Sequence, residues 1–249
     1  MRRSVTVQEL IWKKNRVEVW LSSCIVTSSP RDTDYLIVPA NERLCGTRFA
    51  YFPRGGPTPN AKYIGEEKNV LLKEERSEYL YSYECIDGLV SELGGQVVEN
   101  SLAQLPRVSG TDEYYIKCPT GEARLTQAGS LAHQFPKGLI HTVAPFYGAD
   151  RWQFLLSKAY TSAFEFLNDA SDIVASPLLG SGSRGIPLND AIRIATLSVH
   201  HLGFLRDSSF SIKPQSSSSS FAALGTLRFV LQEVSDAYCL ISALEEVGS

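Results

Sequence analysis

The stretch 172–187, DIVASPLLGSGSRGIP, contains the parts of a strand–loop–helix unit. Its apolar run, Asp172–Leu178, predicts a buried strand, and the glycine-rich run Gly180–Gly185 predicts a tight loop. Pro187 is typical of the first turn of a helix, because the N–H that proline lacks has no partner there. Apolar residues then recur at three- and four-residue steps over 188–202, which predicts a helix with one buried face.

The same alternation continues on both sides of this unit. Because several expected strands are continuous apolar runs, both faces of the sheet that they form should be covered by helices. This pattern predicts an α/β fold with a largely parallel sheet. The other expected strands are Val5–Ile11, Val17–Leu21, Tyr35–Val38, Gly138–Val143 and Thr226–Leu231, and the other expected helices are 152–167, 86–105 with an interruption at Gly94-Gly95, and one from an N-cap at Ser235 to Leu244.

Two segments interrupt this alternation. Residues 46–84 contain RGGPTP and the charged run EEKNVLLKEERSEYLY, which predicts an inserted surface loop with one exposed helix. Residues 207–220 end in PQSSSSS, which is typical of a flexible polar connector. We therefore expect a single domain over 1–249, enlarged by these two surface elements.

Composition excludes several classes of function. The 249 residues include 24 Lys+Arg and 27 Asp+Glu, and the resulting net charge of −3 argues against nucleic acid or an anionic membrane as a partner. No stretch approaches the roughly 20 apolar residues that a membrane helix needs. The five cysteines are scattered and form no CxxC pair, which predicts small buried side chains in an intracellular protein, cytoplasmic or nuclear. No His, Asp and Glu residues have metal-ligand spacing, so we expect neither a metal nor a cofactor.

The run Gly180–Gly185 matches the pattern G-x-G-x-x-G between a strand and a helix. Glycine allows a ligand to approach the backbone closely, and free amides near the start of a helix can face an anion. This context favours a bound phosphate, with an ordinary tight turn as the alternative. A dinucleotide-binding dehydrogenase would carry the motif at its first strand–helix turn, whereas here it begins at residue 180 of 249, which disfavours that class.

Four segments, taken together and in this order, resemble the macro domain, an ADP-ribose-binding α/β module. The segment DYLIVPAN at 34–41 resembles V-D-A-I-V-N-A-A-N, and IDGLV at 86–90 resembles V-D-G-A-I-H. The longest, CPTGEARLTQAGSLAHQFPKGLIHTVAP at 118–145, is similar to T-G-E-A-x-x-T, L-P-A and V-I-H-T-V-G-P, and SPLLGSGSRGIP at 176–187 resembles P-A-I-S-T-G-I-Y-G-Y-P. The resemblance implies a three-layer α/β/α macro-like domain with a mixed, largely parallel central sheet.

The ligand that the resemblance implies is ADP-ribose, free or attached to an ADP-ribosylated protein. Asn41 would lie near the distal ribose, and Asp87 would position or activate the water that attacks it. The implied activity is hydrolysis of mono-ADP-ribosyl linkages or of O-acetyl-ADP-ribose. The alternatives are a non-catalytic reader of ADP-ribose and an interaction module without nucleotide binding. The implied ligand-binding residues are Ile86, Gly88 and Leu89 in the first loop and Gly180, Ser181, Gly182, Ser183, Arg184 and Gly185 in the second.

The chain also departs from the family pattern. No aspartate stands around Cys24, where the family contacts adenine, Val38 replaces the first asparagine of N-A-A-N, and the glycine tract before V-D-G is absent. Ser91 replaces the histidine after V-D-G-A-I, and Arg184 replaces the aromatic residue of the second loop. Arg184 would either pair with phosphate or point into solvent. The absent glycine tract and Ser91 favour the reader, the missing aspartate favours the interaction module, and the retained Asp87 favours the enzyme.

Three polar residues also have ordinary structural interpretations. Asn41 would serve equally well as a turn residue at the end of a strand. Asp87 could instead cap a helix, where its charge suits the helix dipole. His141 lies inside the apolar run GLIHTV, which predicts a hydrogen-bonded core histidine rather than a catalytic base.

Overall fold

The computed structural model describes residues 8–45, 85–110, 115–206 and 225–248. The helix and loop expected within 46–84, and the connector expected over 207–220, lie outside the described residues. Among the described helices, none has both the length and the apolar character that crossing a bilayer requires.

A seven-stranded mixed sheet forms the centre of the molecule. The strands follow the order β1-β2-β9-β8-β3-β7-β6, and the five central strands are mutually parallel. Only the two edge strands run antiparallel to their neighbours. The strands are β1 (Glu9–Lys14), β2 (Val17–Leu21), β3 (Tyr35–Pro39), β6 (Ala123–Thr126), β7 (Gly138–Thr142), β8 (Ile173–Ser176) and β9 (Thr226–Leu231), and β4 (Ser109–Gly110) pairs with β5 (Tyr115–Ile116) in a separate ribbon.

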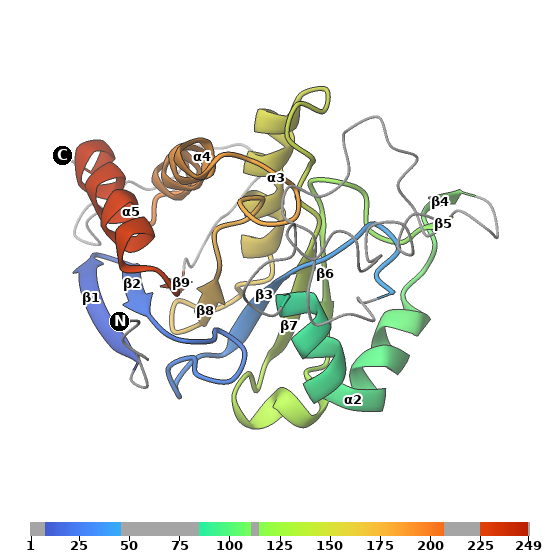
Figure 1. Ribbon diagram of the computed structural model, residues 1–249. Helices are drawn as coiled ribbons and strands as arrows, with labels where there is room; N and C mark the ends of the chain where they lie inside the picture. The colour runs from blue at the N-terminus through green and yellow to red at the C-terminus, as the bar shows by residue number, and fades with distance from the viewer. Residues whose placement is uncertain (1–7, 46–84, 111–114, 207–224, 249) are drawn as a thin grey trace, which may run out of the picture.

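Helices cover both faces of this sheet, as Figure 1 shows. One face carries the first described helix together with a short 3-10 helix, and the other face carries the remaining three helices. This arrangement confirms the expected three-layer α/β/α fold with a mixed, largely parallel sheet. The helices are α2 (Ile86–Gln104), the 3-10 helix η2 (Gly129–His133), α3 (Trp152–Phe164), α4 (Leu188–His201) and α5 (Val234–Val247).

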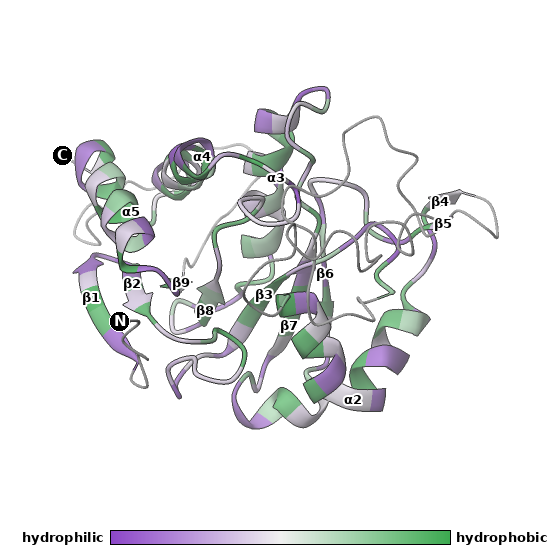
Figure 2. Cartoon of the chain, viewed as in Figure 1, coloured by the Kyte–Doolittle hydropathy of each residue, from purple (hydrophilic) through white to green (hydrophobic). Residues whose placement is uncertain are grey.

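Strand β3 shows why the central strands of the sheet are continuous apolar runs. Its side chains alternate between two hydrophobic clusters: Tyr35 and Ile37 pack with α3 and α4, whereas Leu36 and Val38 pack with α2. All four side chains are buried, because helices cover both faces of the strand. Figure 2 shows this concentration of hydrophobic residues in the central strands.

Helix α2 consists of two helical halves joined by a kink. Gly95 has φ 67° and ψ −161°, which lies outside the helical region and confirms the interruption expected at Gly94-Gly95. The kink packs against η2, where a Cβ on Gly129 would lie 2.2 Å from the carbonyl oxygen of Gly94. The second half of α2 follows the kink. Near its end, the carbonyl oxygens of Leu102 and Ala103 accept hydrogen bonds from Lys117 Nζ at 2.6 and 2.9 Å.

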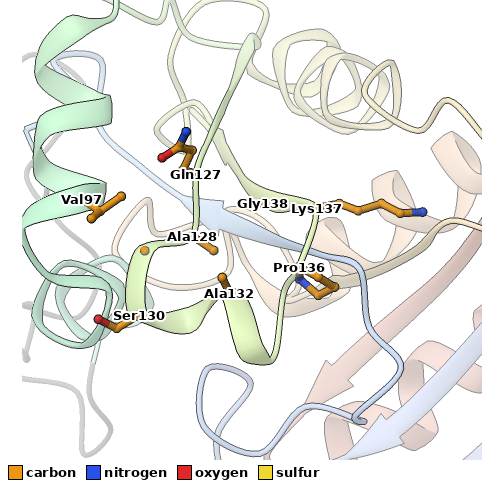
Figure 3. Close-up of a pocket in the computed structure, with 9 residues that line it drawn as sticks. Val97, Gln127, Ala128, Ser130, Ala132, Pro136, Lys137 and Gly138 are labelled. Atoms are coloured by element: carbon orange, nitrogen blue, oxygen red, sulfur yellow. The ribbon is translucent and has the colours of Figure 1, made fainter.

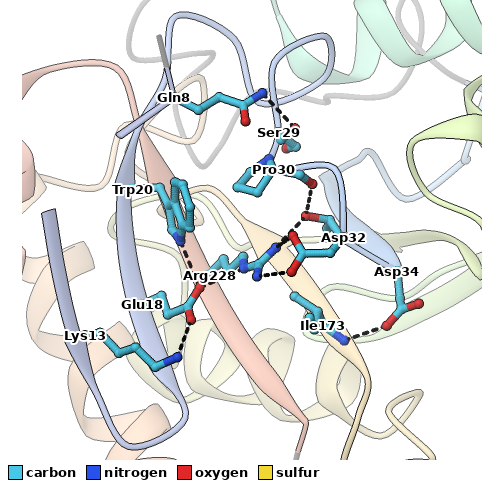
Figure 4. A network of polar contacts seen from close by, with 11 residues as sticks. Gln8, Lys13, Glu18, Trp20, Ser29, Pro30, Asp32, Asp34, Ile173 and Arg228 are labelled. Atoms are coloured by element: carbon cyan, nitrogen blue, oxygen red, sulfur yellow. Dashed lines mark hydrogen bonds and ion pairs between the residues drawn. The ribbon is translucent and has the colours of Figure 1, made fainter. Parts of the chain in front are cut away.

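A charged network centred on the buried residues Glu18 and Arg228 holds the first part of the sheet together (Figure 4). Arg228 on β9 donates from Nε to Glu18 on β2 at 2.8 Å, and from Nη1 and Nη2 to the two carboxylate oxygens of Asp32 at 2.7 and 2.9 Å. Although burial raises the pKa of Glu18, hydrogen bonds from Lys13, Trp20 and Arg228 lower it overall. The network therefore keeps a buried carboxylate charged and joins β2 and β9 to the loop that precedes β3.

Several local expectations need correction. Helix α5 begins at Val234 with Glu233 at the N-cap, so Ser235 lies inside the helix rather than capping it. Pro187 lies at the N-cap of α4, one position before the first helical turn. Strand β6 and η2 were not expected, because a four-residue edge strand and a single 3-10 turn leave no clear periodicity.

Of the five cysteines, only Cys118 is fully buried. Burial raises the pKa of its thiol to about 12, so it acts as a small apolar side chain. Cys45 and Cys239 are exposed, and the expectation that the cysteines are buried is wrong for these two.

Candidate functional site

The carboxyl ends of the five parallel strands meet along one edge of the sheet. The antiparallel strand β6 begins at this same edge, because its Ala123 pairs with Thr142, the last residue of β7. The turns that follow β3, β7 and β8 therefore lie beside one another here. In α/β sheets, ligands bind outside the carboxyl ends of the strands, which makes this edge the candidate site.

The loop after β8 is held in a compact, well-defined shape. Gly180 and Gly185 have φ of 82° and 71°, which residues with a side chain rarely adopt. The N–H of Ile186 donates to the carbonyl oxygen of Gly180 at 3.1 Å, which closes the loop. At its start, the N–H of Leu179 donates to the buried hydroxyl of Tyr160 on α3 at 2.9 Å. The backbone path of the glycine loop is thus set by two glycines and two hydrogen bonds.

Three consecutive amides within this loop are available to a ligand. Among the residues that the structure describes, no acceptor is hydrogen-bonded to the N–H groups of Ser181, Gly182 and Ser183. The Ser181 hydroxyl donates inward, to the carbonyl oxygen of Leu178 at 3.0 Å, and so does not compete for the same position. Successive free amides form a concave donor surface that suits a phosphate.

Arg184 does not point into solvent, so that alternative from the sequence is wrong. Its side chain is buried and reaches the turn after β3, where Nη2 donates to the carbonyl oxygen of Ala40 at 3.2 Å. Nη1 lies 3.3 Å from the carboxylate of Glu42, and the guanidinium stacks 4.2 Å from the ring centroid of Phe146. Arg184 therefore connects the loops that follow β8, β3 and β7.

Asn41 lies in this same turn, between Ala40 and Glu42. Its side-chain oxygen accepts hydrogen bonds from the N–H of Arg43 at 3.2 Å and from the Cys45 thiol at 3.6 Å. These contacts match the strand-end turn interpretation of Asn41. They also hold its side chain at the carboxyl edge, next to the residues that Arg184 contacts.

The first turn of α2 contains Ile86, Asp87, Gly88 and Leu89. Asp87 is buried in this turn, where its charge suits the helix dipole, and the N-cap position is Cys85, whose side chain makes no capping hydrogen bond. Leu89 packs in the same cluster as Ala40 and Leu44 in the turn after β3. The kink of α2, by contrast, packs against η2, which joins the far ends of β6 and β7. This topology places the first turn of α2 toward the same edge as the glycine loop.

An open hollow of about 430 Å³ lies at the opposite edge of the sheet, between the kink of α2 and η2 (Figure 3). Its lining includes Val97, Ser130 and Lys137, which are exposed. The Lys137 amine pairs with the carboxylates of Asp34 and Asp172 rather than facing a cavity. The hollow therefore offers no converging polar groups and is a poorer candidate than the carboxyl edge.

His141 is a core residue, as expected. Its Nε2 lies 2.9 Å from the Thr126 hydroxyl, and complete burial lowers the pKa of the imidazole to about 4. The ring is therefore neutral at physiological pH, and its burial agrees with a core histidine rather than a catalytic base. No group of three or more His, Cys, Asp or Glu residues in the described part of the chain could hold a metal ion.

Comparison with known proteins agrees with this geometry. A family model described as "Macro domain" matches residues 77–195, which include the first turn of α2, β7 and the glycine loop. Just under half of the chain therefore matches the macro domain family. Its relatives include the macro domain-containing proteins TTE0995 of Caldanaerobacter subterraneus (29% identical, 44% of this chain and 59% of the relative) and VPA0103 of Vibrio parahaemolyticus (31%, 44% and 61%). The match thus spans about three fifths of the length of these relatives.

Solved macro domains share the fold over nearly the whole chain. A mutant of the Oceanobacillus iheyensis macrodomain has a TM-score of 0.64 at 16% identity, covering 98% of this chain and 96% of its own. The same macrodomain with ADP has a TM-score of 0.59 at 18% identity, with coverages of 97% and 95%. The Trypanosoma brucei macrodomain in complex with ADP has a TM-score of 0.57 at 16% identity, with coverages of 92% and 69%.

The loop after β2 lies outside the segment that matches the family model. The segment 22–30, SSCIVTSSP, contains no acidic residue. The Ser22 hydroxyl accepts a hydrogen bond from the N–H of Cys24 at 3.3 Å and donates to the carbonyl oxygen of Ser28 at 2.8 Å. The two hydrogen bonds of the Ser22 hydroxyl thus close the loop. Its polar groups are backbone and hydroxyl groups rather than carboxylates.

Sequence reasoning missed three residues of the site. Glu42 contacts Arg184, Phe146 stacks on it, and Tyr160 anchors the start of the glycine loop. Glu42 could have been noticed because it directly follows Asn41 in the turn after DYLIVPAN. Tyr160 is one apolar position in the periodic pattern of α3, and no sequence signal distinguishes its hydroxyl.

Proposed function

We propose that this protein binds ADP-ribose or mono-ADP-ribosyl groups at the carboxyl edge of its sheet. The observation that carries the proposal is the row of amides at Ser181, Gly182 and Ser183, which have no hydrogen-bond acceptor among the described parts of the chain. Such a row suits one phosphate group and contributes nothing to the formal charge, so it is compatible with the net charge of −3. The solved macrodomains that contain ADP or ADPR support the choice of ligand.

A charge placed within the row of amides tests this site. Gly182, unlike Gly180 and Gly185, does not have a positive φ, so other residues fit its backbone conformation. Gly182→Asp puts a carboxylate where the phosphate would bind and should lower the affinity for ADP-ribose by at least about tenfold. Gly182→Asn has nearly the same shape without the charge and is the matched control.

Titration calorimetry with ADP-ribose measures both variants against the wild type. A much larger loss for Gly182→Asp than for Gly182→Asn supports a phosphate on these amides. Equal affinities for the two variants would place the phosphate elsewhere. No heat from the wild-type chain at millimolar ADP-ribose would contradict binding itself and favour a macro-like interaction module.

The buried carboxylate of Asp87 favours a second, finer function, hydrolysis of the ADP-ribosyl linkage or of O-acetyl-ADP-ribose. A carboxylate can act as a general base when a water bridges it to the electrophile. The location of Asp87 in the first turn of α2, toward the edge that carries the glycine loop, supports this role. For an ADP-ribosyl linkage, its carboxylate would take a proton from that water as the water attacks the anomeric carbon of the distal ribose and the bond from that carbon to the protein breaks, the departing group taking up a proton. For O-acetyl-ADP-ribose, the same water would attack the acetyl carbonyl carbon and release acetate.

Asp87→Asn separates the enzyme from a non-catalytic reader. The amide keeps the shape of the side chain but cannot accept the proton, so release of ADP-ribose from a mono-ADP-ribosylated protein should fall by about a hundredfold or more. Binding of free ADP-ribose should change much less. Equal release by both proteins would remove Asp87 from the mechanism, and no release by the wild type would favour the reader.

We also propose an intracellular location, cytoplasmic or nuclear. The support is that the five cysteines are scattered along the sequence and form no CxxC pair, which suits a reducing compartment. Fractionation of cells that express the full-length protein tests this location.

A further inference from the structure

The ion pair between Arg184 and Glu42 spans the candidate site from the loop after β8 to the turn after β3. Arg184 follows the three free amides directly in the sequence. Its guanidinium is held by Glu42, by the carbonyl oxygen of Ala40 and by the ring of Phe146. Glu42 also accepts a hydrogen bond from the Thr120 hydroxyl at 3.0 Å, so its carboxylate has a second partner besides Arg184.

The contacts of Arg184 with Glu42 are long for a charged pair. The nitrogen–oxygen distances are 3.3 and 3.4 Å, whereas those between Arg228 and Asp32 in the same molecule are 2.7 and 2.9 Å. Charge-assisted hydrogen bonds are usually about 2.7–2.9 Å long. The guanidinium is therefore held near Glu42 without the close bidentate geometry that Arg228 achieves.

We propose that Glu42 and Arg184 form a charge switch that sets the affinity of the glycine loop for the phosphate of a nucleoside diphosphate, an inference that rests on the proposed function of that loop. When a phosphate binds the amides, Arg184 exchanges its contact with Glu42 for one with a phosphate oxygen. Glu42 acts in the opposite direction. Its carboxylate competes for the guanidinium and repels the incoming anion.

This arrangement predicts effects of opposite sign for the two partners. Arg184→Ala removes the cation and should weaken the binding of ADP-ribose and of inorganic pyrophosphate by about tenfold. Glu42→Gln removes the competing charge and should strengthen the binding of both ligands by about fivefold. A purely structural bridge between the two loops would instead weaken binding in both variants.

Glu42→Gln preserves the local structure, because glutamine keeps an oxygen that can accept the hydrogen bond from Thr120. Glu122→Gln is the matched control. Glu122 precedes β6 at the same edge, but it pairs with Arg124 and Lys158 rather than with Arg184. Glu122→Gln removes the same charge as Glu42→Gln, and the affinity for ADP-ribose and pyrophosphate should change by less than about twofold. Urea denaturation of each variant checks that the fold is retained.

Arg184→Lys provides a second test, in which Glu42 itself is unchanged. A lysine keeps the charge but cannot contact Glu42 and the Ala40 carbonyl at once through a planar fork. Its affinity should lie between those of the wild type and Arg184→Ala. Because the effect of Glu42 is electrostatic, the difference between Glu42→Gln and the wild type should shrink as the salt concentration is raised.

Calorimetry with the two ligands distinguishes the outcomes. Tighter binding by Glu42→Gln, together with weaker binding by Arg184→Ala, supports the switch. Unchanged or weaker binding by a folded Glu42→Gln variant overturns it. A wild-type chain that binds pyrophosphate but not ADP-ribose, with the opposite effects retained, supports the switch and contradicts the proposed function. A chain that binds neither ligand overturns both.

Discussion

Tyr160→Phe removes a single oxygen atom and tests how the glycine loop is anchored. The hydroxyl of Tyr160 accepts a hydrogen bond from the N–H of Leu179 at 2.9 Å, and both residues are fully buried. Phenylalanine fills almost the same volume but leaves this N–H without its acceptor. An unsatisfied buried donor costs about 1–3 kcal/mol, and we expect a loss of about 2 kcal/mol in the free energy of unfolding.

Urea denaturation measures this loss. With a slope of about 3 kcal/mol per molar urea for a chain of this size, a loss of about 2 kcal/mol lowers the midpoint by about 0.7 M. The affinity for ADP-ribose should fall as well, because Gly180 follows Leu179 directly and begins the loop that carries the free amides. Tyr238→Phe is the control, because Tyr238 on α5 is 61% exposed and its hydroxyl can bond water.

Two results would contradict this reasoning. If Tyr160→Phe is as stable as the wild type, the hydrogen bond does not hold the loop in solution. If stability falls while the affinity for ADP-ribose is unchanged, the anchor stabilises the core but does not position the amides.

Three further changes test the fold around the site. Because burial lowers the pKa of His141 to about 4, the unfolded chain binds more protons than the folded one between about pH 4 and 6.5. The free energy of unfolding should therefore fall by on the order of 3 kcal/mol as the pH is lowered through this range. In urea denaturation, His141→Leu should show a flatter dependence of stability on pH than the wild type. Arg228→Met leaves a buried carboxylate without its arginine and should cost about 3 kcal/mol in urea denaturation, whereas Arg193→Met, at an exposed i,i+3 pair, should cost less than about 0.5 kcal/mol. Gly180→Ala places a Cβ 2.5 Å from Ile186 Cδ1 at a φ of 82° and should lower the thermal midpoint by several degrees, with no shift expected if the loop relaxes freely.

Much of the fold could be predicted from local patterns. The structure confirms β2 and β9 at the expected bounds of Val17–Leu21 and Thr226–Leu231. Both are short β-branched or aromatic runs, whose preference for extended backbone agrees with their burial in the sheet. The interruption of α2 was also predictable, because Gly94-Gly95 combines low helix propensity with access to positive φ.

Other local features depended on contacts that no short pattern reveals. Strand β6 is only four residues long, and it forms because β7 offers it an edge to pair with. The start of α5 shifted to Val234 although Ser235 is a better capping residue, and the Ser235 hydroxyl instead contacts Asp236. Tertiary packing overrides capping preferences of about 1 kcal/mol.

The sequence by itself determined the α/β class, the family resemblance and the glycine loop, because these depend on local periodicity and on glycine's access to positive φ. Only the tertiary structure decided which side chains meet at the carboxyl edge. The direction of Arg184, the role of Glu42 and the anchor at Tyr160 depend on residues separated by as many as 144 positions in the chain. Such pairs are set by strand order and by the turns between strands, which no short stretch of sequence specifies.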